Sequence, residues 1–461
     1  MFETNELTVD AQELRATIQG TVHVPGDESW DVARQAWNLA VDQRPAMVAI
    51  PATAGDVVAV VRFAERNGLR VAPQGTGHNA AAIASLENTI LLKTSALRDV
   101  EIDAAGRRAR VGAGVLWAEV TGPASQHGLA PLAGSSPDVG VVGYTLGGGL
   151  SWLSRRHGLA ANSVLAIEIV TADGRLVRTD RDNEPDLFWA LRGGGGSFGV
   201  VTALEFVLYP APEVYAGAML WPWERSAEVL DRYVTWCRTA PAAISTSIRI
   251  LQVPPMPDIP EALQGRCFVA IDGAYLGDEA SATAALASLR ALEPEIDMFA
   301  MVPAAALSHI HMDPETPVPA AGDGMILDDL TPAAIEAFVA ATGPGSGSPL
   351  LSVELRQLGG AIGTPPAEHG ALAKLSGTFA LFAVGIPMDA EAGAAIDAHL
   401  EHVLEAMDPW DAGRRYLNFT ERPADARAFF TDGTHRRLQA VKARYDAGDV
   451  FCSNHPVSVD A

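Results

Sequence analysis

Three glycine-rich segments carry the residues of this sequence best suited to binding an anionic ligand. They cover residues 73–80, 134–149 and 193–199. Glycine lets backbone amides approach a ligand closely and adopt positive φ, and rows of such amides bind phosphate groups. A single loop of this kind is usually a turn, but three in one region favour a site for a pyrophosphate.

Two of these segments contain formal dinucleotide fingerprints. Residues 75–80 read GxGxxA and residues 194–199 read GxGxxG, which is the spacing of a Rossmann nucleotide site. A Rossmann fingerprint must lead into a helix, whereas strands are predicted over 89–92 and 200–208. No GxxxxGK[ST] motif occurs in the sequence. The sequence therefore argues against a Rossmann fold and against P-loop phosphate transfer.

The segment 134–149 is the most informative of the three. Its glycines at 140, 143, 147, 148 and 149 are too frequent for a stable helix and too regularly placed for a linker. They predict backbone that lies flat against a planar or anionic group.

Four motifs in order carry a resemblance to a known family. They are GTGHN at 75–79, GSSPDVGVVGYTLGGG at 134–149, LRGGGGSFGVVT at 191–202 and RRYLNF at 414–419. Together they resemble the berberine-bridge-enzyme-like flavoproteins of the vanillyl-alcohol-oxidase and p-cresol methylhydroxylase superfamily. The resemblance covers most of the chain.

The resemblance implies an α+β chain in two domains, with the FAD-binding fold of the p-cresol methylhydroxylase type. Residues 1–212 are expected to form the FAD-binding domain. Residues 213–409 are expected to form a mixed α/β substrate domain, an antiparallel sheet covered by helices, and residues 410–461 to return to the FAD-binding domain.

The resemblance also implies the cofactor and the residues that hold it. In the family, the histidine of the first loop is bonded to the 8α-methyl group of FAD, and here that residue is His78. Many members add a second bond through a cysteine where this chain has Ser136; since serine cannot form the thioether, attachment through His78 alone is expected. Gln74 stands where arginine is common, which removes one charge-assisted phosphate contact. The expected cofactor residues are Gln74, Gly75, Thr76, Gly77, His78, Asn79, Ser135, Ser136, Val139, Gly140, Gly143, Tyr144, Gly147, Gly148, Gly149, Leu150, Gly196, Ser197, Gly199, Val200, Val201, Tyr416 and Asn418.

The catalytic chemistry implied by the resemblance is hydride transfer from a substrate C–H bond to flavin N5, followed by reoxidation by dioxygen. In several relatives the base is the last tyrosine of YxNY, which is Phe419 in this chain. The expected catalytic residues are Tyr144, Tyr416, Glu354 and Arg356. Alternation along 350–360 places Glu354 and Arg356 on one face of a strand. A solvated salt bridge at a sheet edge is the alternative for that pair, and ordinary packing for the two tyrosines.

Three functions stay open at this point. The first is an oxidase that acts on an alcohol, a sugar or a secondary metabolite. The second is a tailoring oxygenase or oxidative cyclase on the same scaffold. The third is a flavin-binding protein without turnover, because Phe419, Gln74 and Ser136 all depart from the family pattern.

Composition limits the partners. The 56 acidic and 33 basic residues give a formal charge of −23, which argues against nucleic acid and anionic membrane surfaces. The three cysteines form no disulfide framework, and the first residues lack a secretory pattern, so a cytoplasmic location is expected. His309 and His311 lack a third ligand, so no metal is expected and a surface or cavity-lining loop is predicted there. Substrate and dioxygen are the expected partners; oligomeric state cannot be read from the sequence.

Periodicity predicts the elements that must position these residues. Helices are expected over 29–41, 54–68, 116–127, 187–191 and near 150–157, with strands over 47–51, 69–73 and 89–92 and hairpins over 97–112 and 165–179. Beyond a boundary at 209–212, helices are expected over 225–240, 279–292, 331–342 and 389–407, and strands over 245–253, 266–275, 350–358 and 376–386.

Overall fold

A small sheet of mixed direction is built by the first hundred residues. In the computed structural model, which describes residues 11–83, 85–257 and 259–459, its strands lie in the order β1-β2-β4-β3. β2, β4 and β3 run parallel, and β1 pairs antiparallel with β2. Its elements are α1 (Ala11–Thr17), β1 (Thr21–His23), α2 (Trp30–Arg34), β2 (Met47–Ile50), α3 (Ala54–Arg66), β3 (Arg70–Gln74) and β4 (Thr89–Lys93).

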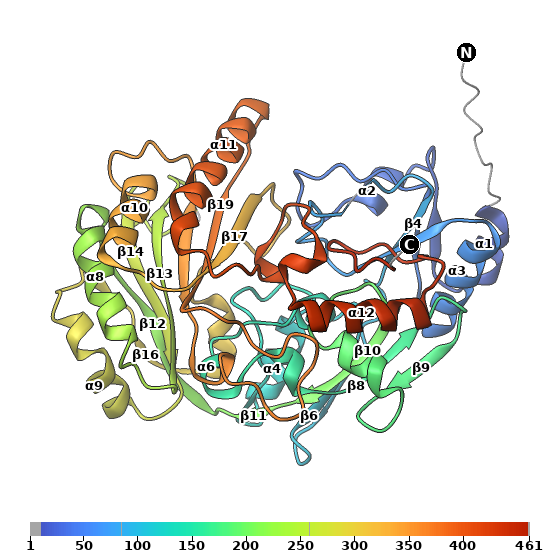
Figure 1. Cartoon of the computed structure of the whole chain (residues 1–461), viewed down its shortest axis with the longest axis horizontal. Helices are drawn as coiled ribbons and strands as arrows, with labels where there is room; N and C mark the ends of the chain where they lie inside the picture. The colour runs from blue at the N-terminus through green and yellow to red at the C-terminus, as the bar shows by residue number, and fades with distance from the viewer. Residues whose placement is uncertain (1–10, 84, 258, 460–461) are drawn as a thin grey trace.

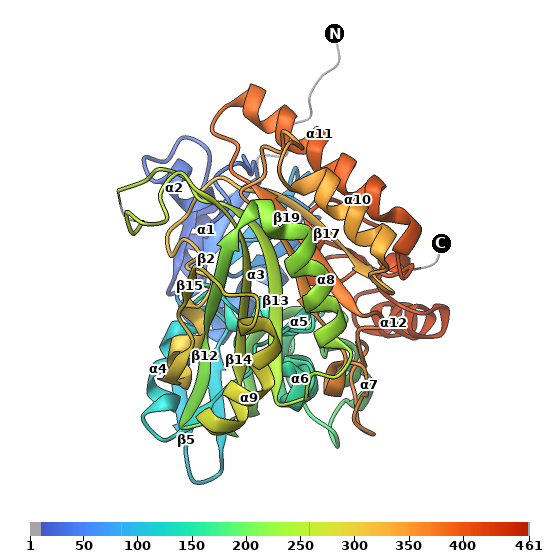
Figure 2. The ribbon, with the colours of Figure 1, turned by 90° about the vertical axis from the view of Figure 1, so that its left-hand side faces the viewer.

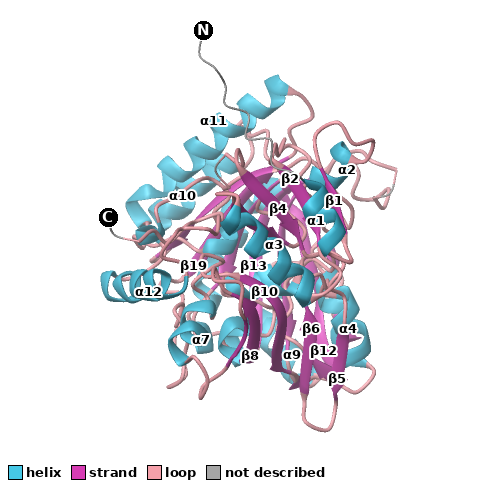
Figure 3. Ribbon diagram, turned by 90° about the vertical axis from the view of Figure 1, so that its right-hand side faces the viewer, coloured by secondary structure: helices cyan, strands magenta, loops and turns pink. Residues whose placement is uncertain are grey.

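A second, antiparallel sheet follows in the order β5-β6-β10-β8-β9 (Figure 3). Short helices and β7 lie between its strands along the chain, and β7 pairs with β11, which follows β10. The elements are β5 (Val100–Asp103), β6 (Arg108–Gly112), α4 (Ala118–Ser125), β7 (Leu129–Ala130), α5 (Val141–Leu146), α6 (Ser154–His157), β8 (Val164–Val170), β9 (Leu176–Thr179), α7 (Pro185–Leu191), β10 (Val200–Val207) and β11 (Tyr209–Pro210). The first two sheets share one apolar core, in which α3 packs with Val57, Val60 and Val61 buried.

A large antiparallel sheet occupies the middle of the chain, in the order β15-β12-β14-β13-β18-β19-β17, with β16 beside β12. Its elements are β12 (Glu213–Pro222), α8 (Ser226–Cys237), β13 (Ile244–Gln252), β14 (Cys267–Tyr275), α9 (Glu279–Arg290), β15 (Ile296–Asp297), β16 (Ala300–Pro303), β17 (Ala321–Leu327), α10 (Pro332–Thr342), β18 (Ser352–Gln357), β19 (Phe379–Gly385) and α11 (Ala390–Met407). Helices α8, α9, α10 and α11 cover one face (Figure 2), and the other face turns toward the first two sheets (Figure 1).

The two faces of the large sheet differ in chemistry. Val353 and Leu355 of β18 pack into the core beneath the helices. Glu354 and Arg356 alternate with them and lie on the face toward the glycine-rich loops. β18 is a central strand, paired with β13 and β19, and both charged side chains are buried. The alternative of a solvated salt bridge at a sheet edge is therefore wrong.

The last fifty residues return to the first two sheets. Helix α12 (Asp432–Tyr445) packs against α7, and Lys442 Nζ donates to the carbonyl of Ser197. The N–H of Val71 in β3 donates to the carbonyl of Val450, and its carbonyl accepts from the N–H of Cys452. The bounds 1–212, 213–409 and 410–461 stay a prediction. No helix within 11–83, 85–257 or 259–459 is long and apolar enough to cross a membrane.

Two helix predictions need correction. The helix expected over 29–41 ends at Arg34, because the N–H groups of Trp37 and Asn38 donate to the carbonyls of Thr76 and Gly77. The segment 134–149 does contain a helix, α5, despite its glycines. Burial of Val141, Val142 and Thr145 outweighs the low helix propensity of the segment. Strands β12 and β17 and helix α12 lie in stretches where no such element was predicted.

Candidate functional site

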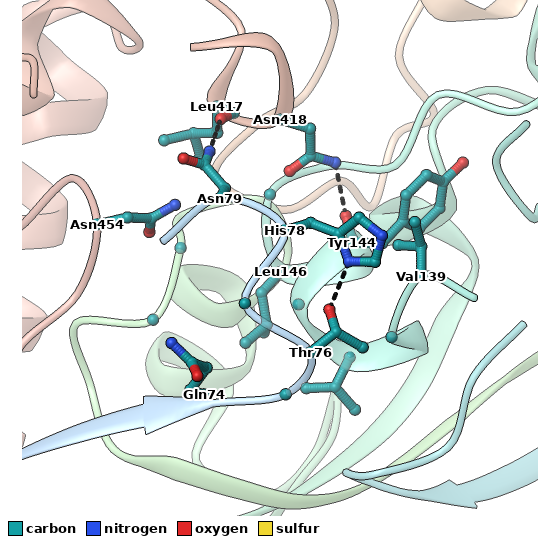
Figure 4. A pocket seen from close by; sticks show the side chains of 18 of the residues that line it. Gln74, Thr76, His78, Asn79, Val139, Tyr144, Leu146, Leu417, Asn418 and Asn454 are labelled. Atoms are coloured by element: carbon teal, nitrogen blue, oxygen red, sulfur yellow. Dashed lines mark hydrogen bonds between the residues drawn. The ribbon is translucent and has the colours of Figure 1, made fainter. Parts of the chain in front are cut away.

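A single cavity brings the glycine-rich loops, the large sheet and the C-terminal motif together. Its walls come from residues within 73–83, 134–150, 195–201, 416–421 and 452–454, together with Thr94, Ala113 and, from β18, Arg356. Its volume is about 370 Å³. Figure 4 shows side chains from these separate segments pointing toward one another.

The first loop presents a row of backbone donors to this cavity. Among the described residues, the N–H groups of Gly75 to Asn79 have no hydrogen-bond acceptor. Asn79 fixes the end of the loop, because its Nδ2 donates to the carbonyls of Leu417 and Thr420. Such a row suits a group that carries several anionic oxygens.

His78 lies in this loop and is held on three sides. Its Nδ1 is 2.7 Å from Thr76 Oγ1, as Figure 4 shows. Its ring stacks on Trp37 with centroids 4.0 Å apart, and its Nε2 lies 3.6 Å from Asp138 Oδ2. The ring is therefore fixed while its edge lines the cavity.

The second loop wraps around Tyr144 and meets the C-terminal motif. Asn418 Nδ2 donates to the carbonyl of Tyr144 at 2.9 Å and contacts the Tyr416 hydroxyl at 3.1 Å. Gly147 is needed at this junction, because a Cβ there would lie 1.8 Å from Asn418 Oδ1. The side chain of Asn418 thus joins the loop to residues 416–419 (Figure 4).

Both tyrosine hydroxyls stay protonated at neutral pH. Burial raises the pKa of Tyr144 well above 10, and the neighbouring Tyr416 raises it further. Burial likewise raises the pKa of Tyr416, against the opposing effects of Asn418 and Arg356. These side chains can donate hydrogen bonds to a ligand but are poor bases.

Arg356 brings a positive charge to the cavity from the sheet. Its Nε donates to Glu354 Oε1 at 2.5 Å, and its guanidinium carbon lies 4.9 Å from the Trp152 ring centroid and 5.7 Å from that of Phe419. Glu354 is its one hydrogen-bond partner within the described parts of the chain, so the two terminal amino groups remain available for a ligand.

A second buried ion pair lies beside the first on the same face. Arg249 of β13 makes a bidentate contact with Asp272 of β14, at 2.7 and 2.8 Å. Arg249 is directly opposite Glu354 in the sheet, and His311 stacks edge-on against Trp152 at 5.0 Å. On the sheet face behind the cavity, each of these two buried arginines is therefore paired with a carboxylate.

The structure brings most of the predicted site residues together. Those that line the cavity are Gln74, Gly75, Thr76, Gly77, His78, Asn79, Ser135, Ser136, Val139, Gly140, Gly143, Tyr144, Gly147, Leu150, Gly196, Gly199, Val201, Arg356, Tyr416 and Asn418. The residues that line the cavity do not include five of the predicted site residues, which are Gly148, Gly149, Ser197, Val200 and Glu354. Ser197 instead bonds Ser453 and the N–H of Val457, which ties the third loop to the C-terminal segment.

Several residues near the cavity were missed from the sequence, and three of them carry chemistry. Glu421 and Cys452 line it from the end of the chain, and Asp138 lies beneath His78. Burial, together with Asp323, raises the pKa of Glu421 to about 7. Asp138 lies inside the motif at 134–149, so its position in the sequence could have indicated a place near the cavity. No motif around Glu421 or Cys452 connects those two residues with the cavity.

The histidine pair also differs from its prediction. His309 is the last residue of a short 3₁₀ helix and is exposed, which agrees with the predicted surface position. His311 is buried against Trp152 and does not line the cavity. Burial and the nearby Arg249 and Arg356 lower its pKa well below 6.5. No cluster of three or more His, Cys, Asp or Glu able to hold a metal occurs within the described residues.

The residues of the cavity fit FAD. The row of free N–H groups in the first loop suits a pyrophosphate. Buried polar atoms without a hydrogen-bond partner among the described residues lie around the same cavity: Gln74 Oε1, Asn79 Oδ1 and the Tyr144 hydroxyl. Such atoms cost free energy unless a ligand bonds them.

Comparison with known proteins agrees with this fit. A family model described as an FAD binding domain matches residues 45–180. The chain is 39% identical over 206 residues to (R)-6-hydroxynicotine oxidase of Paenarthrobacter nicotinovorans, covering 44% of this chain and 45% of that protein. It is 30% identical over 234 residues to glucooligosaccharide oxidase of Sarocladium strictum, covering 50% and 47%. The matched region thus spans about half the length of these curated relatives.

Solved structures extend the similarity over the whole fold. BBE-like 1 of Physcomitrella patens superposes with a TM-score of 0.86 at 20% identity, covering 98% of this chain and 99% of that one. The crystal structure of 6-hydroxy-D-nicotine oxidase from Arthrobacter nicotinovorans gives 0.80 at 26% identity, covering 96% and 98%. This confirms the predicted α+β, p-cresol methylhydroxylase-type fold. The chain thus shares its fold with a BBE-like protein and with 6-hydroxy-D-nicotine oxidase, and residues 45–180 are similar to an FAD binding domain.

Proposed function

We propose that this chain is an FAD-dependent oxidase that acts on a small organic molecule, such as an alcohol, a sugar or a secondary metabolite, with dioxygen as the electron acceptor. The observation that carries the proposal is that Arg356, from the large sheet, shares one cavity with the loops of the FAD binding domain. When bound there, FAD supplies a hydride acceptor at N5 that dioxygen reoxidises.

The loops hold the cofactor in this proposal. The N–H groups of Gly75 to Asn79 bind the pyrophosphate, and the backbone of 140–147 lies along the flavin. Asn418 fixes that backbone through its bond to the carbonyl of Tyr144. Gln74 contributes no charge, so the phosphate is held mainly by the backbone dipoles.

The sheet orients the substrate and stabilises developing negative charge. Arg356 directs its terminal N–H groups at a substrate oxygen, which favours an alkoxide or phenolate as the C–H bond breaks. Glu354 keeps the guanidinium in place through its bond to Nε. Tyr144 and Tyr416, protonated at neutral pH, donate hydrogen bonds, and Phe419 replaces a base with an apolar wall.

The finer proposal is that FAD is bonded covalently through His78 alone. The fixed ring of His78 at the cavity edge supports this link. Ser136 cannot form a thioether, and Cys452 is buried, with burial raising its pKa, so its thiol stays protonated and unreactive. We also propose a cytoplasmic location, on the three scattered cysteines.

Acid precipitation, substrate screening and oxygen balance test this function. The purified chain should be yellow, and flavin should stay with the precipitate. A library of alcohols, sugars and phenolic metabolites should contain compounds that bleach the flavin without air, and air should restore the colour with one hydrogen peroxide per turnover. Incorporation of labelled oxygen into the product would indicate the tailoring oxygenase instead, and a flavin that no compound reduces would indicate a binding role.

A further inference from the structure

The carboxylate of Asp138 lies beside the His78 ring. The proposed oxidation of a substrate gives this carboxylate no role. It lies 3.6 Å from His78 Nε2 and is nearly buried, with 12% of its side chain exposed. The other imidazole nitrogen, Nδ1, is 2.7 Å from the hydroxyl of Thr76. The two ring nitrogens therefore face different chemistry, a carboxylate on one side and a hydroxyl on the other.

Asp138 is fixed through both of its oxygens. Trp37 Nε1 donates to Oδ2 at 2.5 Å, and Ser136 Oγ donates to Oδ1 at 3.0 Å. Burial raises the pKa of Asp138, but the neighbouring His78 and the hydrogen bonds from Ser136 and Trp37 outweigh it and hold the pKa below its usual value. Asp138 is therefore a carboxylate at neutral pH.

Trp37 acts on the imidazole twice. It anchors Asp138 through its N–H, and its ring stacks on the His78 ring with planes 17° apart. The stack fixes the plane of the imidazole, while Asp138 fixes its rotation within that plane. Trp37 reaches the loop because α2 ends at Arg34 and the N–H of Trp37 donates to the carbonyl of Thr76.

These contacts decide where the imidazole proton lies. At 3.6 Å the Asp138 carboxylate makes no direct hydrogen bond with Nε2, but its negative charge favours the tautomer with the proton on Nε2. Nδ1 then keeps its lone pair, to which the Thr76 hydroxyl can donate. His78 is thus prepared as a nucleophile at Nδ1.

We propose that Asp138 is the positioning residue that directs covalent attachment of FAD to His78, assisted by Trp37 and Ser136. This rests on the proposed function and deepens it. The new bond joins Nδ1 to the 8α carbon of FAD. The methyl group gives up one hydrogen and the imidazole gives up its Nε2 hydrogen toward Asp138. The two electrons released reduce one dioxygen to hydrogen peroxide, which takes up both protons.

Ser136 gains a role from this arrangement. At the position where many relatives have a cysteine that forms a second bond to the flavin, this chain has a hydroxyl that holds Asp138.

The test compares variants of the full chain loaded with FAD in air. In wild type, His78→Ala, Asp138→Asn, Asp138→Glu and Ser136→Ala, the linked fraction is followed over time from flavin fluorescence on denaturing gels and from intact mass, with total flavin measured before denaturation. We expect Asp138→Asn to bind FAD but to attach it about 100-fold more slowly, as for loss of a positioned proton acceptor. Asp138→Glu should recover part of the rate, and Ser136→Ala should slow it severalfold. One hydrogen peroxide should form per bond in wild type.

The outcomes separate the two proposals. Attachment in Asp138→Asn at the wild-type rate overturns the role of Asp138 and leaves the histidyl link intact. A wild type without linked flavin, or His78→Ala that still links it, overturns the link and the role together. If Asp138→Asn loses FAD altogether, Ser136→Ala decides, because an unchanged rate in a variant that binds FAD fully contradicts the proposal.

Discussion

Arg356 lies between Glu354 and the rings of Trp152 and Phe419, so its substitution changes both the buried charge balance and the surface offered to a substrate. Arg356→Met should lower kcat/KM about 100-fold, as for loss of a donor to developing negative charge. It should also cost about 3 kcal/mol of unfolding free energy, because Glu354 is left buried and unpaired. Steady-state kinetics and denaturant unfolding measure the two effects.

A double variant separates them. Arg356→Met combined with Glu354→Leu removes both charges and should recover most of the stability but none of the activity. Activity that returns with stability would mean that Arg356 acts only through folding.

Glu421 makes the stability of the chain depend on pH. Its pKa is raised to about 7 by burial and by Asp323, so the folded chain holds a proton that the unfolded chain loses from about pH 4.5 upward. Glu421 therefore contributes fully to the free energy of unfolding below about pH 4.5, and this contribution is lost as the pH rises through 7. Glu421→Gln should therefore gain up to about 3 kcal/mol relative to wild type between these limits.

Unfolding in urea at a series of pH values measures this difference. The exposed Glu87 provides the control, since Glu87→Gln should show no such trend. A difference between wild type and Glu421→Gln that does not change with pH would mean that Glu421 is ionised in the folded chain throughout.

At the scale of the element, α5 and the turn behind it place Tyr144. Gly149 has φ +76°, and a Cβ there would lie 2.6 Å from Tyr144 Cε1 and from Ala160 Cβ. Gly149→Ala should cost about 3 kcal/mol or more and displace Tyr144. Gly26 is the matched control: its φ is +99° but a Cβ would meet nothing within 4 Å, so Gly26→Ala should cost about 1 kcal/mol. Denaturant unfolding measures both variants. If the two lose the same unfolding free energy, the neighbours of Gly149 move aside without an energetic cost.

Periodicity predicted most elements of the chain, and it failed where tertiary contacts decide the backbone. Helices α8 to α11 and strands β13, β14, β18 and β19 lie close to their predicted ranges because each buries a regular stripe. The helix over 29–41 stops early because the 76–77 carbonyls take the N–H groups of residues 37 and 38. Strand β17 carries Gly322 and Gly324, which weaken a strand pattern; a Cβ at Gly324 would lie 2.7 Å from the carbonyl of Phe419.

At the scale of the whole molecule, Arg155 of α6 joins the FAD binding domain to the large sheet. It is buried and donates to the carbonyls of Ile244 and Leu358, among others. Arg155→Leu leaves several buried carbonyls without partners, which should cost about 3 to 5 kcal/mol. The neighbouring Arg156 is exposed, so Arg156→Leu should stay within about 0.5 kcal/mol of wild type. Calorimetry compares them; an Arg155 variant as stable as wild type would show that the interface does not depend on this side chain.

The site could be predicted from the sequence only where a motif is local. The loops at 73–80 and 134–149 carry their glycines together, so most of the residues predicted from them lie around one cavity. Glu421 and Cys452 reach the same cavity from far along the chain, and no spacing connects them to it. The pairing of Arg249 with Asp272 depends on the order of strands, which periodicity does not give.

The cavity walls contributed by residues 73–201 and 416–454 are separated in the chain by the large sheet. A ribosome therefore finishes the glycine-rich loops well before it makes the residues that close over them. At about 5 to 20 residues per second, the nascent chain spends many seconds with half of its cofactor site exposed. The cavity can therefore be complete only after residues 416–454 have been synthesised.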